Sequence, residues 1–571
     1  MIYKTKRQQL DLIKSSLENE RSSFESHWRD LSDFILPRRS RFSISDVNKG
    51  DRRNQKIIDS TATLAARTLR SGIMSGVTSP ARPWFRLTTQ DPDLAEWGPV
   101  KQWLHLVQQR ITASYLKSNL YNILPTVYGD LGVFGTAAMS AEEVFNGDVI
   151  HAKSFPIGSY WVAKDEFGRI NTFVREFRMT VAQLLETFGE KKNGEFDWSN
   201  FSTYVRSQYE QGNLQTWIDV THFVMPNMEH DQKNPIAKFK KFTSCYFESG
   251  TGYDSRQDEK YLRESGYDYF PVLVPRWETT AEDVYGTNCP GMEALGDIKQ
   301  LQNGEKRIME AVDKMIRPPM KGPTTMKGQA ASIISGDITY IDNVNGQGFE
   351  PVYEVNFRIQ EMEMKQAQVR SRIQRSFYED LFLMLSNLDR RQITAREIEE
   401  RHEEKLLALG PVLEQINQDL LDPLTDIAFN IHLRQRLLPP PPPELQGMEL
   451  KVEYISVMAQ AQKMLGVSSI ERFTQFVGGL AQVDQSVLRK IKADQIVDVY
   501  GEMLSVPPSI VRTDEEVQQI VQAEQAQQMQ QMQMQQQMQT VDMAKKLSET
   551  KINQQDVALD ELIRQAQSGG I

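Results

Sequence analysis

The stretch MEALGDIKQLQNGEKRIMEAVDKMI, residues 292–316, has the pattern of a long helix. Residues 318–355 follow it, beginning with two prolines that cannot continue a helix. They are rich in glycine, proline and β-branched residues, which is typical of short strands and turns. A second helical pattern covers residues 357–385, roughly 40 Å at about 1.5 Å per residue. Two long helices are therefore predicted on either side of a small β-like insert.

A short polar stretch and a third long helix come next. SNLDRRQI, residues 386–393, interrupts the helical pattern. The capping box TARE, residues 394–397, then starts a helix toward Leu437. Pro411 and Pro423 lie within that helix and are expected to kink it.

The C-terminal part is divided by prolines. Five prolines, residues 439–443, predict a stiff spacer, and ELKVEYIS, residues 449–456, predicts a strand. A helical block is predicted over residues 457–504. After another proline pair, a final helix is predicted from Asp514 to about Gln567.

The N-terminal part combines helices with strands. Apolar residues at three-four spacing predict a helix over residues 10–35, and further helices are predicted from Asp59 or Ser60 to Gly76 and over residues 99–116. SYWVAKDEFGRINTFVREF alternates apolar and polar residues around a turn at 166–168, which predicts a hairpin. The expected fold class is α+β, mainly α.

Composition excludes several classes of protein. At 571 residues the chain is too long for one compact core. It has no apolar run long enough to cross a bilayer and no signal peptide. Its only cysteines are Cys245 and Cys289, so we expect no disulfide framework. We expect assembly in a reducing cytoplasm. No phosphate-binding loop, catalytic motif or metal signature is found, so no catalytic residue, metal or cofactor is predicted. The net charge of −10 argues against tight wrapping of nucleic acid.

The two long helices carry many basic side chains. Periodicity alone favours a solvated face with i,i+4 partners, such as Glu310 with Lys314 and Glu361 with Lys365. The basic residues are Lys299, Lys306, Arg307, Lys314, Arg358, Lys365, Arg370, Arg372 and Arg375.

The order of elements resembles the portal, or head-to-tail connector, protein of short-tailed bacteriophages. The stretches that carry the likeness are FESHWRDLSDFILPRRSRF, DSTATLAARTLRSGIMSGVTSPARPWFRLT, VYGDLGVFGTAAMSAEE, EDVYGTNCPGMEALGDIKQLQNGEKRIMEAVDKMIRPP and SNLDRRQITAREIEER. Together they span most of the chain up to the proline run. The resemblance implies a ring, usually of twelve subunits, at one capsid vertex, with a central channel for double-stranded DNA.

The resemblance also implies partners and a location. The expected partners are other copies of the chain, the large subunit of the packaging terminase, tail adaptor and tail tube proteins, the major capsid and scaffolding proteins, and the DNA that passes through. No membrane partner is expected. The protein would be assembled in the host cytoplasm, nucleate the procapsid, and reside in the virion at the head–tail junction.

Family anatomy can be laid on the predicted segments. The expected units are a wing (1–281), a first stem helix (282–317), a clip (318–355), a second stem helix (356–385), a tunnel loop (386–393), a long kinked helix with the proline spacer and a wing strand (394–456), a crown (457–506) and a C-terminal barrel helix (507–571).

The resemblance nominates residues for each functional surface. For the DNA-facing tunnel loop they are Asn387, Asp389, Arg390, Arg391 and Gln392. For the channel-lining stem they are Lys299, Lys306, Lys314, Arg358, Lys365 and Arg372. For the clip and adaptor docking they are Lys321, Lys327, Asp337, Tyr340 and Asp342.

Charge is consistent with this placement. Moving DNA would stall on tight phosphate contacts, whereas an acidic wall with scattered basic rings permits transient ones. Arg390 and Arg391 are the best candidates for such a ring, because a loop residue repeated about an axis becomes a belt of charge. The alternative is that they only cap the preceding helix C-terminus.

The segment QAEQAQQMQQMQMQQQMQTVDMAKKL, residues 522–547, consists mostly of glutamine and methionine. Alone it would be disordered or prone to aggregate. Its apolar residues form a ragged stripe at helical spacing, so we expect a helix ordered by oligomerisation into a barrel. The nominated barrel residues are Met529, Met532, Met538 and Val541.

Two other kinds of function are considered. In a scaffold or coiled-coil interaction protein of the virion, the glutamine-rich tail would drive assembly. A DNA-processing enzyme is less favoured, because the phosphate loop is missing.

Overall fold

The computed structural model describes residues 5–46, 50–91, 94–95, 97–145, 149–192, 194–249, 260–280, 282–317, 320–321, 350–351, 358–387, 409–445, 450–454, 473–480, 496–497, 517, 520–527, 529–532, 534 and 538. The chain divides into two compact units, Met1–Gln462 and Lys463–Ile571. Among the described residues no helix has both the length and the apolar character to cross a membrane.

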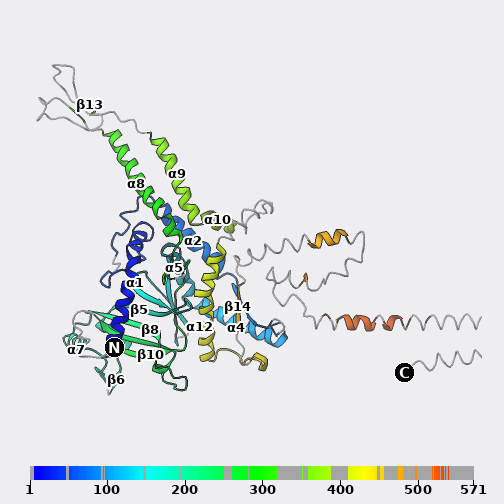
Figure 1. The fold of residues 1–571 in the computed structure, drawn as a ribbon. Helices are drawn as coiled ribbons and strands as arrows, with labels where there is room; N and C mark the ends of the chain where they lie inside the picture. Colours follow the sequence, from blue (N-terminus) through cyan, green and yellow to red (C-terminus); the bar gives the residue numbers. More distant parts are fainter. Residues whose placement is uncertain are drawn as a thin grey trace, which may run out of the picture. The chain divides into compact units, whose positions relative to one another are not determined.

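A five-stranded antiparallel sheet forms one layer of the first unit, in the order β10-β9-β8-β5-β4 (Figure 1). Its strands are β4 (Tyr160–Lys164), β5 (Ile170–Thr180), β8 (Trp217–Pro226), β9 (Phe242–Ser249) and β10 (Arg263–Tyr267). The N-terminal helix α1 (Lys6–Phe34) packs on this sheet through Leu10 and Leu17, which join a cluster with Val174 and Phe223. The hairpin predicted in SYWVAKDEFGRINTFVREF is confirmed as β4–β5.

A three-stranded sheet and a peripheral cluster adjoin the large sheet. β11 (Val272–Leu273), β2 (Ala138–Glu143) and β3 (Ile150–Phe155) form a three-stranded sheet. A separate apolar cluster holds the peripheral elements on one end of the large sheet. These are α6 (Val181–Phe188), α7 (Thr203–Glu210), β6 (Lys191–Lys192) and β7 (Glu195–Phe196), and a short 3-10 turn, η1 (Ala237–Phe239), precedes β9.

The main core lies among the helices. It joins the C-terminal half of α1 to α2 (Thr61–Val77), α4 (Gly98–Lys117) and α5 (Leu120–Phe134). The strand predicted at 449–456 is confirmed as β14 (Leu450–Tyr454), which pairs antiparallel with β1 (Phe85–Thr89). Arg86 and Glu453 form an ion pair across this two-stranded sheet. The mixture of helices and strands confirms an α+β chain.

The predicted pair of long helices is observed, with one difference. α8 (Pro290–Ile316) runs beside α9 (Ile359–Ser376), and β12 (Met320–Lys321) pairs with β13 (Glu350–Pro351) between them in the sequence. The second helix was expected to be continuous to Leu385, and this is wrong. It breaks after α9, and α10 (Glu379–Asn387) follows. At the break Phe377 is fully buried and Tyr378 has a positive φ of 54°.

The described part of the third long helix has the expected irregularity. Residues 409–416 are helical, 417–421 form a π-helical turn (η3, Asn417–Leu421), and α12 spans Asp422–Arg434. Pro423 lacks an N–H, so the regular bond to the carbonyl of Asp419 cannot form there, which accounts for the π-turn directly before it. The start of this helix, at 394–408, lies outside the described residues.

The proline run is fastened to α4. The indole Nε1 of Trp103 donates to the carbonyl of Pro439 at 3.0 Å, and the Arg110 guanidinium donates to the carbonyl of Leu437. The run ends in a 3-10 turn, η4 (Pro443–Leu445), whose Leu445 is buried. In the second unit, residues 473–480 and 496–497 and the described residues between 517 and 538 are helical.

Two glycine-containing segments meet at the base of α8. Gly135 ends α5 with a φ of 75°, and its carbonyl accepts from the Trp277 N–H at 2.8 Å. A Cβ on Gly135 would overlap the carbonyl of Gly286, and one on Gly286 would overlap the carbonyl of Gly135. The Gly286 N–H donates to the Thr136 hydroxyl at 2.8 Å. The stretches VYGDLGVFGT and EDVYGTNCPG therefore pack backbone against backbone.

Gly135→Ala tests this contact, and Gly168→Ala is its matched control. Both glycines have a positive φ, but a Cβ on Gly168, at the β4–β5 turn, meets nothing within 4 Å. We expect Gly168→Ala to lower the free energy of unfolding by about 1 kcal/mol from backbone strain alone. Gly135→Ala should cost about 3 kcal/mol or more, because the added methyl also collides with backbone. Denaturant titrations followed by circular dichroism measure both, and equal losses would contradict the close-packing argument.

A buried histidine lies at the centre of the large sheet. The imidazole of His222 accepts at Nδ1 from Arg175 Nε at 3.3 Å and shares a hydrogen bond at Nε2 with the Ser244 hydroxyl at 3.0 Å. Burial holds the pKa of His222 well below its ordinary value, and the nearby charges of Arg175 and Lys153 lower it further. His222 is therefore neutral in the folded chain at pH 7.

This histidine predicts a loss of stability in acid. As pH falls below about 6.5 the unfolded chain protonates His222 while the folded chain does not, so the free energy of unfolding decreases. The contribution reaches at most about 1.4 kcal/mol per pH unit. Melting temperatures of the native chain and of His222→Gln, measured between pH 7.5 and 5, should differ in slope, with the variant flatter. Parallel curves would show that His222 is protonated in the folded chain.

Candidate functional site: the α8–α9 helix pair

The helix pair extends from the core with its inner end held by α5. Cys289 is the N-cap of α8 and Pro290 its first residue, a position where proline loses no hydrogen bond. The Cys289 thiol donates to the carbonyl of Val133 at 3.2 Å, and a Cβ on Gly291 would overlap that same carbonyl. α8 therefore starts in direct contact with the end of α5.

α8 and α9 approach closely where a glycine faces a glutamine. A Cβ on Gly304 would overlap the side-chain amide of Gln366, which is 7% exposed. The Oε1 atom of Gln366 is buried without a hydrogen-bond partner among the described residues. The crossing is thus tight and polar, and Val369 and Ile373 supply its buried apolar part.

A polar clamp, formed by Asp59, Gln302, Glu305 and Arg370, fastens the pair to the start of α2. Gln302 is 3% exposed, and its Oε1 accepts from the N–H groups of Ile58 (2.6 Å) and Asp59 (2.9 Å). Its Nε2 donates to the carbonyl of Asp59 at 2.8 Å. Arg370, from α9, donates to Asp59 Oδ2 at 2.8 Å and to Glu305 Oε1 at 2.6 Å. One aspartate therefore contacts both helices.

The clamp also perturbs the acid–base behaviour of its members. Burial alone would raise the pKa of Asp59, but hydrogen bonds from Thr61 and Arg370 outweigh it and lower that pKa. The hydrogen bond to Asp59 raises the pKa of Arg370. The ion pair is therefore charged throughout the physiological range and contributes most where Asp59 is ionised.

Three of the nominated stem residues are in ion pairs within the chain. Lys299 Nζ is 2.6 Å from Asp30 Oδ2 of α1. Arg372 makes two contacts with Asp297 of α8, at 2.6 and 3.0 Å. Arg358 forms an ion pair with Glu361 at 3.0 Å. Helical spacing had suggested Lys365 as the partner of Glu361. The charges of these three stem residues are therefore partly neutralised locally.

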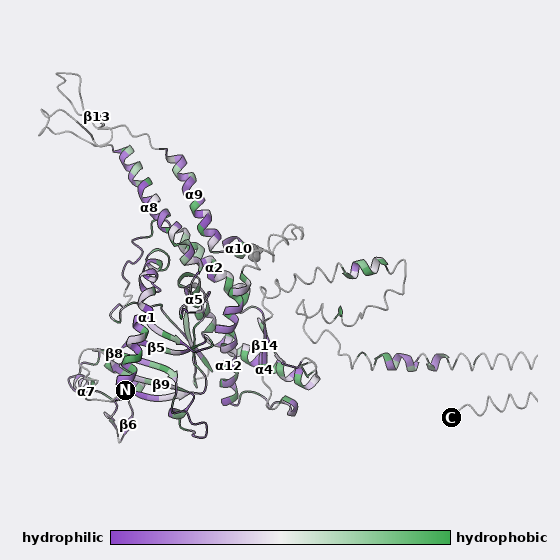
Figure 2. Cartoon of the chain, viewed as in Figure 1, coloured by the Kyte–Doolittle hydropathy of each residue, from purple (hydrophilic) through white to green (hydrophobic). Residues whose placement is uncertain are grey.

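The other three nominated stem residues have exposed side chains: Lys306, Lys314 and Lys365. Both helices are mainly hydrophilic in their outer parts, with apolar side chains interspersed (Figure 2). Exposed apolar residues there are Met309, Met315, Ile316 and Met364. Such a surface can attract phosphate weakly through flexible lysines and can also pack against protein.

Of the nominated residues outside the helix pair, the structure describes five, and nine lie outside the described residues. Lys321 lies in β12, where it is opposite Glu350, and Asn387 is the last residue of α10. Met529, Met532 and Met538 are helical and exposed. Outside the described residues lie Lys327, Asp337, Tyr340, Asp342, Asp389, Arg390, Arg391, Gln392 and Val541.

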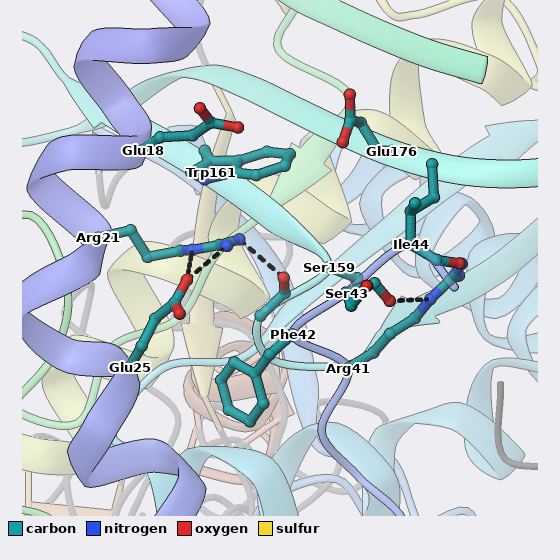
Figure 3. A pocket seen from close by; sticks show the side chains of 11 residues that line it. Glu18, Arg21, Glu25, Arg41, Phe42, Ser43, Ile44, Ser159, Trp161 and Glu176 are labelled. Atoms are coloured by element: carbon teal, nitrogen blue, oxygen red, sulfur yellow. Dashed lines mark hydrogen bonds and ion pairs between the residues drawn. The ribbon is translucent and has the colours of Figure 1, made fainter. Parts of the chain in front are cut away.

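A hollow of about 270 Å³ between α1 and the 41–44 segment shows how charge is used elsewhere in the first unit (Figure 3). Arg21 donates to Glu25 at 2.7 Å and to two main-chain carbonyls. Lys14 contacts both Glu18 and Glu176. The carboxylates that line this hollow are thus all paired with cations, and its lining offers no nucleophile with an adjacent free base. Among the described residues no group of three or more potential metal ligands gathers.

Sequence reasoning missed the clamp. Asp59 was recognised only as a helix start, and Arg370 only as one of many basic residues on the second long helix. Gln302 had a detectable signal, because a glutamine on the apolar stripe of α8 is unusual unless its amide is satisfied. Its partners, the main-chain groups of Ile58 and Asp59, carry no side-chain signature.

Gln302→Leu tests the clamp, with the exposed Gln300→Leu on the same helix as control. Removing the Gln302 amide leaves the N–H groups of Ile58 and Asp59 without their acceptor, a cost of about 2–3 kcal/mol. Hydrogen exchange of those two amides, followed by mass spectrometry, should accelerate at least about tenfold in Gln302→Leu. Gln300→Leu should leave it unchanged. If both variants exchange like the native chain, the clamp does not hold the helix pair.

Comparison with known proteins agrees with this architecture. A family model described as bacteriophage head to tail connecting protein matches residues 7–511. A portal protein of Salmonella phage epsilon15 is 47% identical over 548 residues, 96% of each chain. A probable portal protein of Bordetella phage BPP-1 is 40% identical over 562 residues, 98% of each chain. The matches cover both the core and the helix pair, and the chain therefore belongs to the bacteriophage head-to-tail connecting protein family.

Proposed function

We propose that this chain is the portal subunit of a phage virion and forms a ring of twelve copies around a channel for double-stranded DNA. The observation that carries the proposal is the α8–α9 pair. It is fixed to the core at one end by the clamp and by α5, and its other end leads into the paired strands β12 and β13. A two-helix arm repeated about an axis would make a wall, and head-to-tail contacts between identical subunits form a ring when the rotation closes.

In this proposal the predicted segments take the family's roles. α8 and α9 are the stem, residues 318–355 the clip, 386–393 the tunnel loop, 457–506 the crown, and residues 1–281 with β14 the wing. The pairing of β14 with β1 supports the last assignment, because it returns the chain to the N-terminal part after the long helices.

The charge distribution supports passage of DNA without tight binding. Lys299, Arg358 and Arg372 are held in ion pairs, and the chain as a whole has a net charge of −10. The remaining exposed lysines would make contacts that exchange rapidly and weaken with salt. During packaging and ejection the channel would thus guide DNA, while the ends of the ring dock the terminase and later the tail proteins, and the ring nucleates the procapsid.

The C-terminal helix, residues 507–571, would form a barrel with its copies in the ring. Every described residue between 517 and 538 is exposed, including Val517, Ile520 and Val521. Apolar residues on a helix without an intrachain partner are buried when identical helices pack side by side.

Negative-stain microscopy of the native chain and of a chain lacking residues 510–571 separates the portal from a tail-driven scaffold. We expect rings in both, and loss of rings in the shortened chain would favour the scaffold.

Arg390 and Arg391 test the DNA-contact role. We expect Arg390→Ala with Arg391→Ala to leave rings intact while changing the amount of DNA packaged or retained, because a belt of charge around the channel is removed. The control pair, Arg206→Ala with Lys233→Ala, removes two exposed charges from the wing and should leave packaging unchanged. Particle yield and DNA content per head are measured after complementation of a portal-deficient phage. Failure of the first pair to form rings would make the loop structural instead.

A further inference from the structure

A row of polar side chains crosses one face of the five-stranded sheet. Arg175 of β5 is opposite His222 of β8, His222 is opposite Tyr246 of β9, and Tyr246 is opposite Arg263 of β10. Facing residues in register project from the same side of a sheet. The rings of His222 and Tyr246 stack at 3.7 Å with an interplanar angle of 7°. Two guanidinium groups thus bracket a flat, neutral aromatic pair.

Arg175 is buried without an acidic partner. It is 8% exposed, and its Nε donates to His222 Nδ1. Its guanidinium lies 4.8 Å from the ring centre of Phe155 and 4.5 Å from that of Phe177. Within the part of the chain that the structure describes, no carboxylate forms an ion pair with it. Aromatic faces stabilise a cation less than a carboxylate does, so a buried arginine of this kind retains capacity for an anion.

A second cation points to the same place. Lys153 of β3 is two residues from Phe155 and therefore on the same face of its strand, the face that contacts Arg175. The Lys153 side chain is exposed, but partial desolvation lowers its pKa, and the neighbouring charge of Arg175 lowers it further. The nearby acid is Glu142, an exposed residue whose Oε1 accepts from the Ser140 hydroxyl at 3.3 Å. Two cations against one carboxylate leave the cluster with a net positive charge.

We propose that Arg175 and Lys153, together with the Tyr246 hydroxyl, form an oxyanion-binding site between the two sheets, with a phosphate-like dianion as its preferred occupant. The guanidinium fork supplies parallel N–H donors, the ammonium group a point charge, and the phenol a further donor. A carboxylate shares the same oxygen chemistry but carries one charge fewer, so it should bind more weakly. The neutral His222, held by Arg175 and Ser244, positions the guanidinium rather than contacting the anion.

The site is tested on the intact chain with inorganic phosphate, acetate and chloride at constant ionic strength. Phosphate should raise the melting temperature in a saturable manner, since a ligand that binds only the folded state stabilises it. Acetate should require about tenfold higher concentration for the same shift, and chloride should have no saturable effect. Equal responses to the three anions would reduce the effect to general screening and overturn the proposal.

Two variants locate the effect. Lys153→Gln should raise the half-saturating phosphate concentration about fivefold to tenfold, whereas the control Lys241→Gln, an exposed lysine next to the same sheet, should not change it. Arg175→Lys keeps the positive charge but loses the parallel N–H donors of the guanidinium, so the folded variant should show no saturable response to phosphate. If Arg175→Lys does not fold, the response of Lys153→Gln decides whether the site exists. An unchanged half-saturating concentration in Lys153→Gln would exclude the site.

Discussion

The backbone contact between the end of α5 and the segment before α8 determines where the helix pair begins. Gly135 and Gly286 each leave no room for a Cβ on the other, and Gly291 lies against the carbonyl of Val133. Backbone can approach backbone this closely only at glycine, so the spacing of glycines in two distant stretches fixes the position of α8. The clamp at Asp59 then fixes its orientation.

Charge is used differently at the root and along the outer part of the pair. At the root, Asp59 and Arg370 are partly buried, hydrogen-bonded and joined to uncharged amides. Removing one of these groups therefore leaves its neighbours without hydrogen-bond partners. Farther out, Arg358 and Arg372 form exposed pairs, and Lys306, Lys314 and Lys365 have exposed side chains. Exposed pairs contribute little to stability because water and salt screen them. In the proposed channel, the wall would use this second kind of charge and its attachment to the core the first.

Local pattern predicted the elements well and their contacts poorly. Three-four spacing identified α1 and α8, the alternating stretch identified β4–β5, and the proline at residue 99 marked the start of α4. The resemblance placed the strand at 449–456 in the wing, but neither its partner β1 nor the clamp was predicted, because strand pairing and the Gln302 contacts use main-chain groups far away in the sequence. The stretches that carried the family resemblance contain residues of such long-range contacts: Asp59 and Gln302 of the clamp, and Gly135 of the contact between α5 and the segment before α8. Family resemblance therefore carried information about packing that periodicity could not supply.

The break between α9 and α10 follows from two packing contacts that one straight helix cannot make together. α9 packs on α8 at Gly304, while α10 packs on α2, where a Cβ on Gly72 would overlap the ring of Phe382. We infer that one straight helix could not satisfy both partners. Turning the chain places Tyr378 at a positive φ, a cost of about 1–2 kcal/mol. Burying Phe377 and Phe382 stabilises the fold by about 1.5–3 kcal/mol for each side chain, so the broken helix is favoured. Helical propensity alone would have kept the helix intact, and tertiary packing overrides it.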